Sequence, residues 1–246
     1  MKKALVIAAI VAAAFLAFRG CFGGLTTSWN QRLTLVIETP QGEVRGSAVT
    51  RVTKTDSSGS LVLPEARGVR TDVIGEAIVV EVAPDQFLFA LLSGSDDWQR
   101  DASHWVYPAY HLGAAVGVDS RPSYAAAMMK LRAQPYDTPV PLPPEGWPML
   151  VTFDDITQPE TVRRVDPNDF AAVFGEGVRL KAVTLEITEE AVTAGRVEGV
   201  LGTPFFRDWA TKRKDAFASA NGLNDPYFSS LHATLARNNF VQVTLP

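Results

Sequence analysis

A small group of polar residues between positions 93 and 111 has side chains that could carry out hydrolytic chemistry. The group comprises Ser95, Asp96, Asp97, His104 and His111. Serine, histidine and aspartate are the residue types of an acyl-transfer triad, and histidine with carboxylates is a common ligand set for zinc. A metal-dependent or serine hydrolase centred on residues 93–111 is therefore one hypothesis for this chain.

The spacing of this group argues against both chemistries. His104 and His111 are seven residues apart, which on a helix would separate them by about 10 Å, too far to share one zinc ion. Pro108 lies between them and interrupts a helix. No Gly-x-Ser-x-Gly nucleophile elbow occurs, and neither a phosphate-binding nor a dinucleotide motif is present. We expect aromatic-cluster histidines here, with no catalytic, cofactor-binding or metal residue, and an enzyme is the less favoured interpretation.

The N-terminal 24 residues indicate where the chain works. Lys2 and Lys3 precede an unbroken apolar run from Ala4 to Phe18, as in a bacterial export signal or membrane anchor. Fifteen residues of helix cover about 22 Å, less than the ~30 Å hydrocarbon core. If Arg19 snorkels, Cys21, Phe22 and Leu25 extend the apolar length. The small-residue cleavage signal is poor. We therefore favour a retained anchor over residues 1–24, with a cleaved signal peptide as the alternative.

Cys21 offers a third fate for this segment, because it is the only cysteine and follows the apolar run directly. A bacterial lipoprotein carries its lipid on such a cysteine, but small residues precede it there, whereas Arg19 stands in that position here. Lipid attachment at Cys21 stays an alternative to a bystander thiol at the membrane surface.

Charge fixes the expected orientation and the class of partner. The two N-terminal lysines favour a cytoplasmic N-terminus in the bacterial inner membrane and a periplasmic location for the rest, or a lipoprotein or secreted protein if the segment is processed. None of the 27 acidic residues and three of the 23 basic ones precede residue 22, so the remainder has a formal net charge of −7. This balance argues against nucleic acid. We expect the membrane, through residues 1–24, and an envelope protein as partners.

The remaining chain, residues 25–246, has the pattern of an α+β domain with mainly antiparallel sheet and a few short helices. Alternating apolar residues at 33–38 and 44–53, with Pro40-Gln41-Gly42 between them, predict a hairpin. A proline-rich connector, 135–148, predicts extended geometry between two lobes at about 31–134 and 149–246. Further strands are expected at 60–63, 75–82, 87–92, 149–153, 161–165, 179–188, 196–201 and 240–245.

Three helices are expected. Ser120 to Gln134 has helical spacing after a capping serine. Asp166 followed by Pro167 begins a short helix that Gly175 ends. An amphipathic helix runs from about Phe206 to Asn221-Gly222. A similarity between residues 33–46 and 183–199 is weak enough for coincidence.

Two surfaces could serve partners. The segment PVPLPP at 139–144 is preformed for recognition, but a stiff connector needs the same prolines. Lys212-Arg213-Lys214 is flanked by Trp209 and Phe217, a combination that suits a headgroup or an acidic partner, although a solvated helix face is the commoner explanation.

The chain resembles a group of uncharacterised bacterial envelope proteins with an N-terminal membrane anchor. The resemblance rests on RLTLVIETPQGEVRGSAV at 32–49 and MLVTFDDITQPETVRRVDPNDFAAVFGEGVRLKAVTLEIT at 149–188. No established activity comes with this group, so the resemblance implies no site residue. Together these features favour an envelope accessory or protein-interaction module.

Overall fold

The computed structural model of the chain describes residues 25–57, 68–94, 139–222 and 225–242. The predicted anchor at 1–24, the strand at 60–63, the helix at 120–134 and the first residues of the connector lie outside these ranges. Within them the chain is a mixed α+β structure in which every strand pairing is antiparallel, as the sequence predicts.

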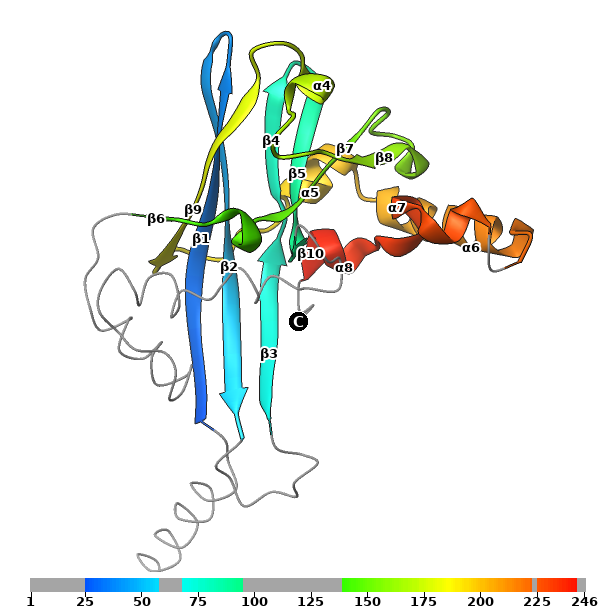
Figure 1. The fold of residues 1–246 in the computed structure, drawn as a ribbon. Helices are drawn as coiled ribbons and strands as arrows, with labels where there is room; N and C mark the ends of the chain where they lie inside the picture. Colours follow the sequence, from blue (N-terminus) through cyan, green and yellow to red (C-terminus); the bar gives the residue numbers. More distant parts are fainter. Residues whose placement is uncertain (1–24, 58–67, 95–138, 223–224, 243–246) are drawn as a thin grey trace, which may run out of the picture.

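In the described parts of the chain, ten strands form two sheets (Figure 1). The six-stranded sheet has the order β10 (Val241–Gln242), β3 (Val69–Glu76), β2 (Gly42–Asp56), β1 (Leu25–Thr39), β9 (Arg179–Thr188), β6 (Val140–Pro141). The four-stranded sheet has the order β4 (Ile78–Ala83), β5 (Gln86–Gly94), β7 (Pro148–Phe153), β8 (Val162–Arg164). Each sheet combines strands from the first and second halves of the chain.

The longest element is the predicted hairpin of β1 and β2, two strands of 15 residues each. Their register runs without interruption from the pair Leu25–Asp56 to the pair Thr39–Gly42, where Gly42 has a φ of 127° that favours glycine. At about 3.3 Å per residue each strand is roughly 50 Å long. Only the upper part of the hairpin is covered by the four-stranded sheet; the lower part continues downward beside β3 (Figure 1). We call the lower part of the hairpin together with the neighbouring part of β3 the stalk, residues 25–31, 50–56 and 69–75.

The two sheets pack face to face around an apolar core. Its most buried members include Leu35, Ile37 and Leu88. Gly46 in β2 allows the close approach, because a Cβ there would lie 2.2 Å from Cγ2 of Val80 in β4. The close packing of the two sheets therefore requires a glycine at position 46, inside a strand.

Helices from the C-terminal part of the chain cover the opposite face of the four-stranded sheet around a second core, in which Phe89, Phe153 and Phe240 are in ring contact. The short helix at 171–174 instead packs into the first core through Phe174. The α-helices are α4 (Ala171–Phe174), α5 (Arg196–Leu201), α6 (Phe205–Ser219), α7 (Leu231–Thr234) and α8 (Arg237–Phe240). Short 3-10 helices are η2 (Pro144–Gly146), η3 (Pro159–Thr161) and η4 (Pro226–Ser229). The molecule thus has three layers: sheet, sheet and helices.

The strand prediction for residues 196–201 is wrong. These residues form α5, and buried Glu76 at the end of β3 accepts hydrogen bonds from the backbone N–H of Arg196 (3.0 Å) and Val197 (3.3 Å). A carboxylate at this position satisfies backbone donors that a helix start leaves unpaired. Residues 183–199 are accordingly a strand and a helix, so they do not repeat the hairpin at 33–46.

The other second-half predictions hold in part. Gly175 ends α4 with a φ of 99°, as expected, but the helix begins only at Ala171. The predicted long amphipathic helix is α6. The predicted strand at 240–245 is reduced to β10, because Phe240 still belongs to α8. In the connector, β6 pairs with β9 and Pro143 is extended, with φ −68° and ψ 158°.

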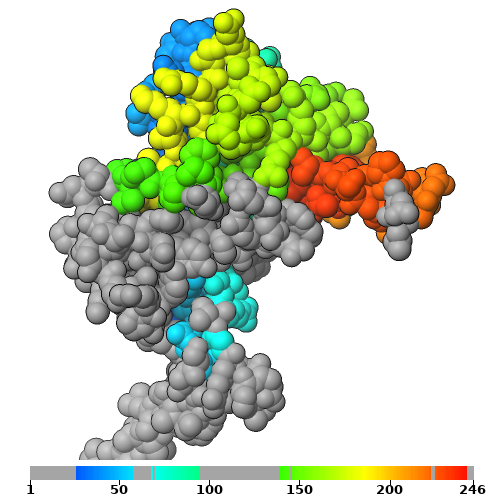
Figure 2. Space-filling view, viewed as in Figure 1, coloured from blue at the N-terminus to red at the C-terminus, as the bar shows by residue number. Residues whose placement is uncertain are grey.

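Helices α6, η4 and α7 project sideways from the layered body (Figure 1). Figure 2 shows the same projection in space-filling form, in orange and red, beside the body. We call these three elements the helical arm. Its base is held by Trp209, which is buried and donates from Nε1 to the backbone carbonyl of His232 at 3.0 Å.

Candidate functional site

The residues that the sequence singled out for chemistry lie outside the described parts of the chain. They are Cys21, Ser95, Asp96, Asp97, His104 and His111. Their neighbour Ser93 is described: it is buried, and its Oγ accepts a hydrogen bond from Nδ2 of Asn239 at 2.7 Å. Ser93 therefore attaches α8 to β5 and has a structural role.

Two aspartates in the second half of the chain serve a turn and a helix start. Asp155 accepts from the backbone N–H of Thr157 at 2.9 Å and from its hydroxyl at 2.7 Å, and these bonds lower the pKa of the Asp155 carboxyl. Asp169 accepts from the backbone N–H of Ala172 in α4 at 3.2 Å. No group of three or more metal-binding side chains is found within the described ranges.

Of the described helices, none has the length and apolar character needed to cross a membrane. The outer face of the six-stranded sheet carries ion pairs that are partly or fully exposed. Arg32 pairs with Glu186 at 3.2 Å, and Lys181 pairs with Glu43, which lowers the pKa of the Glu43 carboxyl. Such cross-strand pairs are ordinary for a solvated sheet face, and they provide no concave site.

The helical arm divides the basic triplet that the sequence singled out. Lys212 is bound to both carboxylate oxygens of Glu160, at 2.6 and 2.8 Å, and so attaches α6 to η3. Arg213 and Lys214 line a pocket of about 300 Å³. Lys212 is therefore structural, whereas its two neighbours belong to a candidate site.

One face of α6 supplies most of this pocket. Its four residues from the helix, Ala210, Arg213, Lys214 and Phe217, follow the spacing that places side chains on one helical face. Tyr227 of η4 forms the remaining wall, and its hydroxyl donates to the backbone carbonyl of Arg213 at 3.0 Å. Because the chain bends back after α6, Tyr227 lies beside this helix face and the two together form the pocket.

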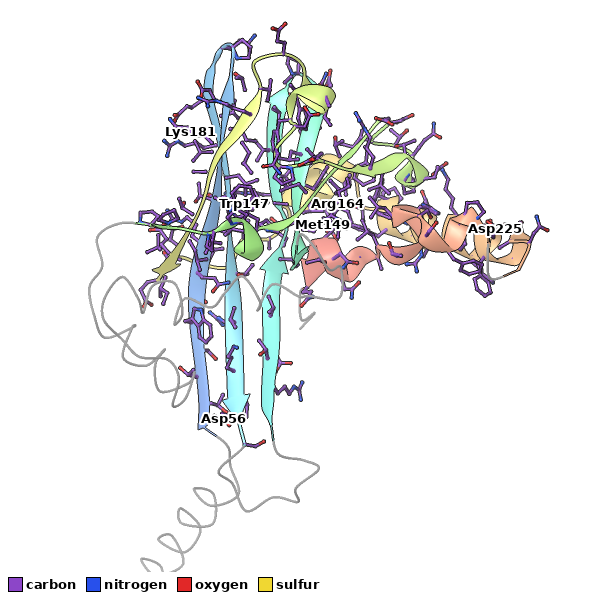
Figure 3. The ribbon with its side chains drawn as sticks, in the orientation of Figure 1. Asp56, Trp147, Met149, Arg164, Lys181 and Asp225 are labelled. Carbon is purple, nitrogen blue, oxygen red and sulfur yellow. The ribbon has the colours of Figure 1, made fainter. Side chains whose placement is uncertain are left out.

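Asp225 fixes that bend. Its carboxylate accepts from the backbone N–H of Asn221 at 2.9 Å and from that of Tyr227 at 2.9 Å, and both bonds lower the pKa of the Asp225 carboxyl. It lies at the outer end of the helical arm in Figure 3. The carboxylate is used in holding η4 against α6, so it organises the pocket wall.

The pocket is basic. The guanidinium of Arg213 is positioned by one hydrogen bond, from Nη1 to the Leu235 carbonyl at 3.1 Å, and its buried Nε has no acceptor. Leaving a buried donor unpaired costs about 1–3 kcal/mol. Within the described residues neither Arg213 nor the exposed Lys214 forms an ion pair, so the site presents two positive charges without a carboxylate.

The pocket is also aromatic at its rim. Phe217 is 64% exposed, the large apolar side chain that stands out in this respect among the described residues. Its ring meets that of Phe228 edge to face, with centroids 5.8 Å apart, and Phe228 in turn contacts Tyr227. An exposed aromatic beside unpaired cations is a feature of binding surfaces rather than of folding.

Buried His232 lies beneath the arm, stacked on Trp209 with centroids 5.8 Å apart. Burial lowers its pKa, although a hydrogen bond to the Pro159 backbone and the Glu160 charge oppose this shift. Its Nδ1 is buried without a partner. The imidazole is enclosed by the arm's base and is not among the residues that line the pocket.

The geometry of the pocket suits binding rather than catalysis. Its lining residues include two cations and two aromatic rings but no nucleophile and base in contact. The sequence pattern identified the basic triplet Lys212-Arg213-Lys214 and the neighbouring Phe217 as a candidate surface, but it did not identify Tyr227. The helix-ending signal at Asn221-Gly222 followed by Asp225-Pro226 marks the bend that returns Tyr227 to α6.

Comparisons with known proteins give no relative: no protein-family model, curated protein or solved structure matches this chain.

Proposed function

We propose that this chain is a membrane-anchored, extracytoplasmic interaction module of the bacterial envelope that binds a partner protein through its helical arm. The observation that carries the proposal is the exposed Phe217 beside the unpaired cations Arg213 and Lys214, over a pocket of about 300 Å³. Aromatic residues and arginine are the types that most often dominate binding energy at protein interfaces.

The form of the molecule supports this proposal. The apolar N-terminal segment ends only a few residues before β1, so a retained anchor would hold the foot of the stalk near the membrane. In Figure 3, Asp56 marks that foot, whereas Asp225 marks the far end of the arm at the level of the layered body. Such a tethered protein presents its arm to other envelope proteins at a distance from the bilayer.

Site-specific crosslinking in living bacteria tests the proposal. A photoreactive phenylalanine analogue replaces Phe217 in the full-length chain, and the same analogue replaces exposed Glu176 as the control on the body. We expect a discrete protein adduct from position 217 and none from position 176. Absence of any adduct at 217, or identical adducts at both positions, would count against an interaction through the arm.

A further inference from the structure

The arrangement of charge and apolar surface on the arm identifies the chemistry of its ligand. We infer that the pocket binds a peptide segment of the partner protein in which a carboxylate lies next to an apolar side chain. This inference rests on the proposed function and deepens it by assigning the ligand of the same site.

The carboxylate follows from the two basic residues. Nη1 of Arg213 is held by the Leu235 carbonyl, which fixes the orientation of the guanidinium plane. Lys214 is the next residue of α6 and lines the same pocket. Across the described ranges neither forms an ion pair, in contrast to Lys212, whose charge is matched by Glu160. A carboxylate between Arg213 and Lys214 would receive charge-assisted hydrogen bonds from both cations, of which the Arg213 guanidinium is already oriented.

The neighbouring apolar group follows from Phe217 and Phe228. Their rings pack edge to face and extend the pocket at its rim, where Phe217 is 64% exposed. An apolar side chain of a ligand would remove this surface from water while its carboxylate meets the cations. A small acidic metabolite would leave most of the aromatic surface uncovered, so a peptide fits the site better.

The position of the arm favours a peptide over a lipid headgroup. Strand β10 follows the arm in the chain and pairs with β3 at Gly75. Gly75 packs against Thr50 of β2, which pairs with Gln31 of β1, so β10 lies at the level of Gln31. Gln31 is six residues above Leu25 on β1, which at about 3.3 Å per residue corresponds to roughly 20 Å. An anchored stalk that stands upright would hold the pocket beyond the reach of headgroups.

Fluorescence anisotropy with the full-length protein in detergent tests the inference. The probe is a labelled six-residue peptide, Gly-Asp-Leu-Phe-Glu-Gly, with an amidated end, and the matched control peptide carries Asn and Gln in place of Asp and Glu. We expect the acidic peptide to bind about tenfold more tightly than the amide peptide. Equal affinities would overturn the assignment of a carboxylate.

Three substitutions locate the binding. Lys214→Gln removes an exposed charge without disturbing the fold, and we expect it to weaken acidic-peptide binding about three- to tenfold, as we expect of Arg213→Gln. The control Arg207→Gln removes the same charge from an exposed position on α6 outside the pocket, and we expect less than about a twofold effect. An equal loss in Arg207→Gln and Lys214→Gln would show diffuse attraction and overturn the inference.

Three further results bear on this inference and on the proposed function. Binding to phosphatidylglycerol vesicles without binding to the acidic peptide would overturn the peptide assignment in favour of a lipid. Crosslinks at position 217 that persist unchanged with Lys214→Gln would overturn the inference while the proposed interaction stands. Conversely, the expected peptide binding without any crosslink in membranes would retain the pocket chemistry and remove the proposed function.

Discussion

His232 shows how the packing of one residue can make the arm sensitive to pH. Its imidazole is buried against Trp209 and contacts Tyr227, while Glu160, Lys212 and Arg213 supply the nearby charges. Burial is the largest cause of its lowered pKa, since an imidazolium is poorly solvated there. The charges of Lys212 and Arg213 act in the same direction, and Glu160 opposes them.

We predict that His232 lowers the stability of the protein as the pH falls. The histidine binds a proton near pH 6.5 in the unfolded chain but only at lower pH in the folded protein. As the pH falls below about 6.5, the free energy of unfolding therefore decreases, and it levels off once the pH is below the pKa of the folded protein. His232→Phe keeps a ring on Trp209 but binds no proton. Urea unfolding followed by tryptophan fluorescence at about pH 8 and pH 5.5 should show a smaller pH dependence in this variant; an unchanged dependence would contradict the prediction.

At the scale of elements, helix α5 depends on a residue far away in the sequence. Glu76 is 1% exposed and ends β3, yet its two carboxylate oxygens accept from the first N–H groups of α5. Gly195 precedes the helix in a left-handed conformation, with a φ of 84°, and provides no side-chain cap. The carboxylate therefore joins the six-stranded sheet to the helical layer.

We predict that Glu76→Ala destabilises the protein by about 2–3 kcal/mol, because one buried and one partly buried backbone donor lose a charged acceptor. Glu176→Gln, at an exposed position, serves as the control and should change the free energy of unfolding by less than about 0.5 kcal/mol. Denaturant unfolding measures both. A Glu76→Ala variant as stable as the control would mean that water or other groups satisfy the helix start.

The same helix shows what the sequence could predict and where it stopped. The β1–β2 hairpin follows from local alternation and a turn, and α6 follows from helical spacing, so both predictions are confirmed. Residues 196–201 are too few to distinguish the alternation of a strand from the 3.6-residue period of a helix. The contact that decides for a helix comes from Glu76, 120 residues earlier. In the pocket, Lys214 and Phe217 lie on one face of α6, which their spacing of three residues predicts. Tyr227 reaches them only through a tertiary bend, which local patterns do not specify.

At the scale of the whole molecule, the foot of the stalk and the arm would lie at two different distances from a membrane that holds the N-terminal segment. The four-stranded sheet covers the upper part of the β1–β2 hairpin, and the arm leaves the body at the top of the stalk (Figure 1). The interlayer contact at Gly46 lies higher still, opposite Leu35 in β1. If the anchor is retained, the chain thus separates attachment at its foot from the binding that we propose at its side.

Depth-dependent quenching measures these two distances. In a Cys21→Ser background, which removes the only native cysteine, single exposed cysteines are introduced by Thr26→Cys at the foot of the stalk and Asn221→Cys on the arm. Each is labelled with a fluorophore in vesicles that contain a headgroup quencher. We predict strong quenching at position 26 and weak quenching at 221, because about 20 Å separates the stalk foot from the level of the arm and exceeds the reach of contact quenching. Strong quenching at both positions would mean that the arm lies on the bilayer. In that case the basic pocket would face lipid headgroups instead of a protein.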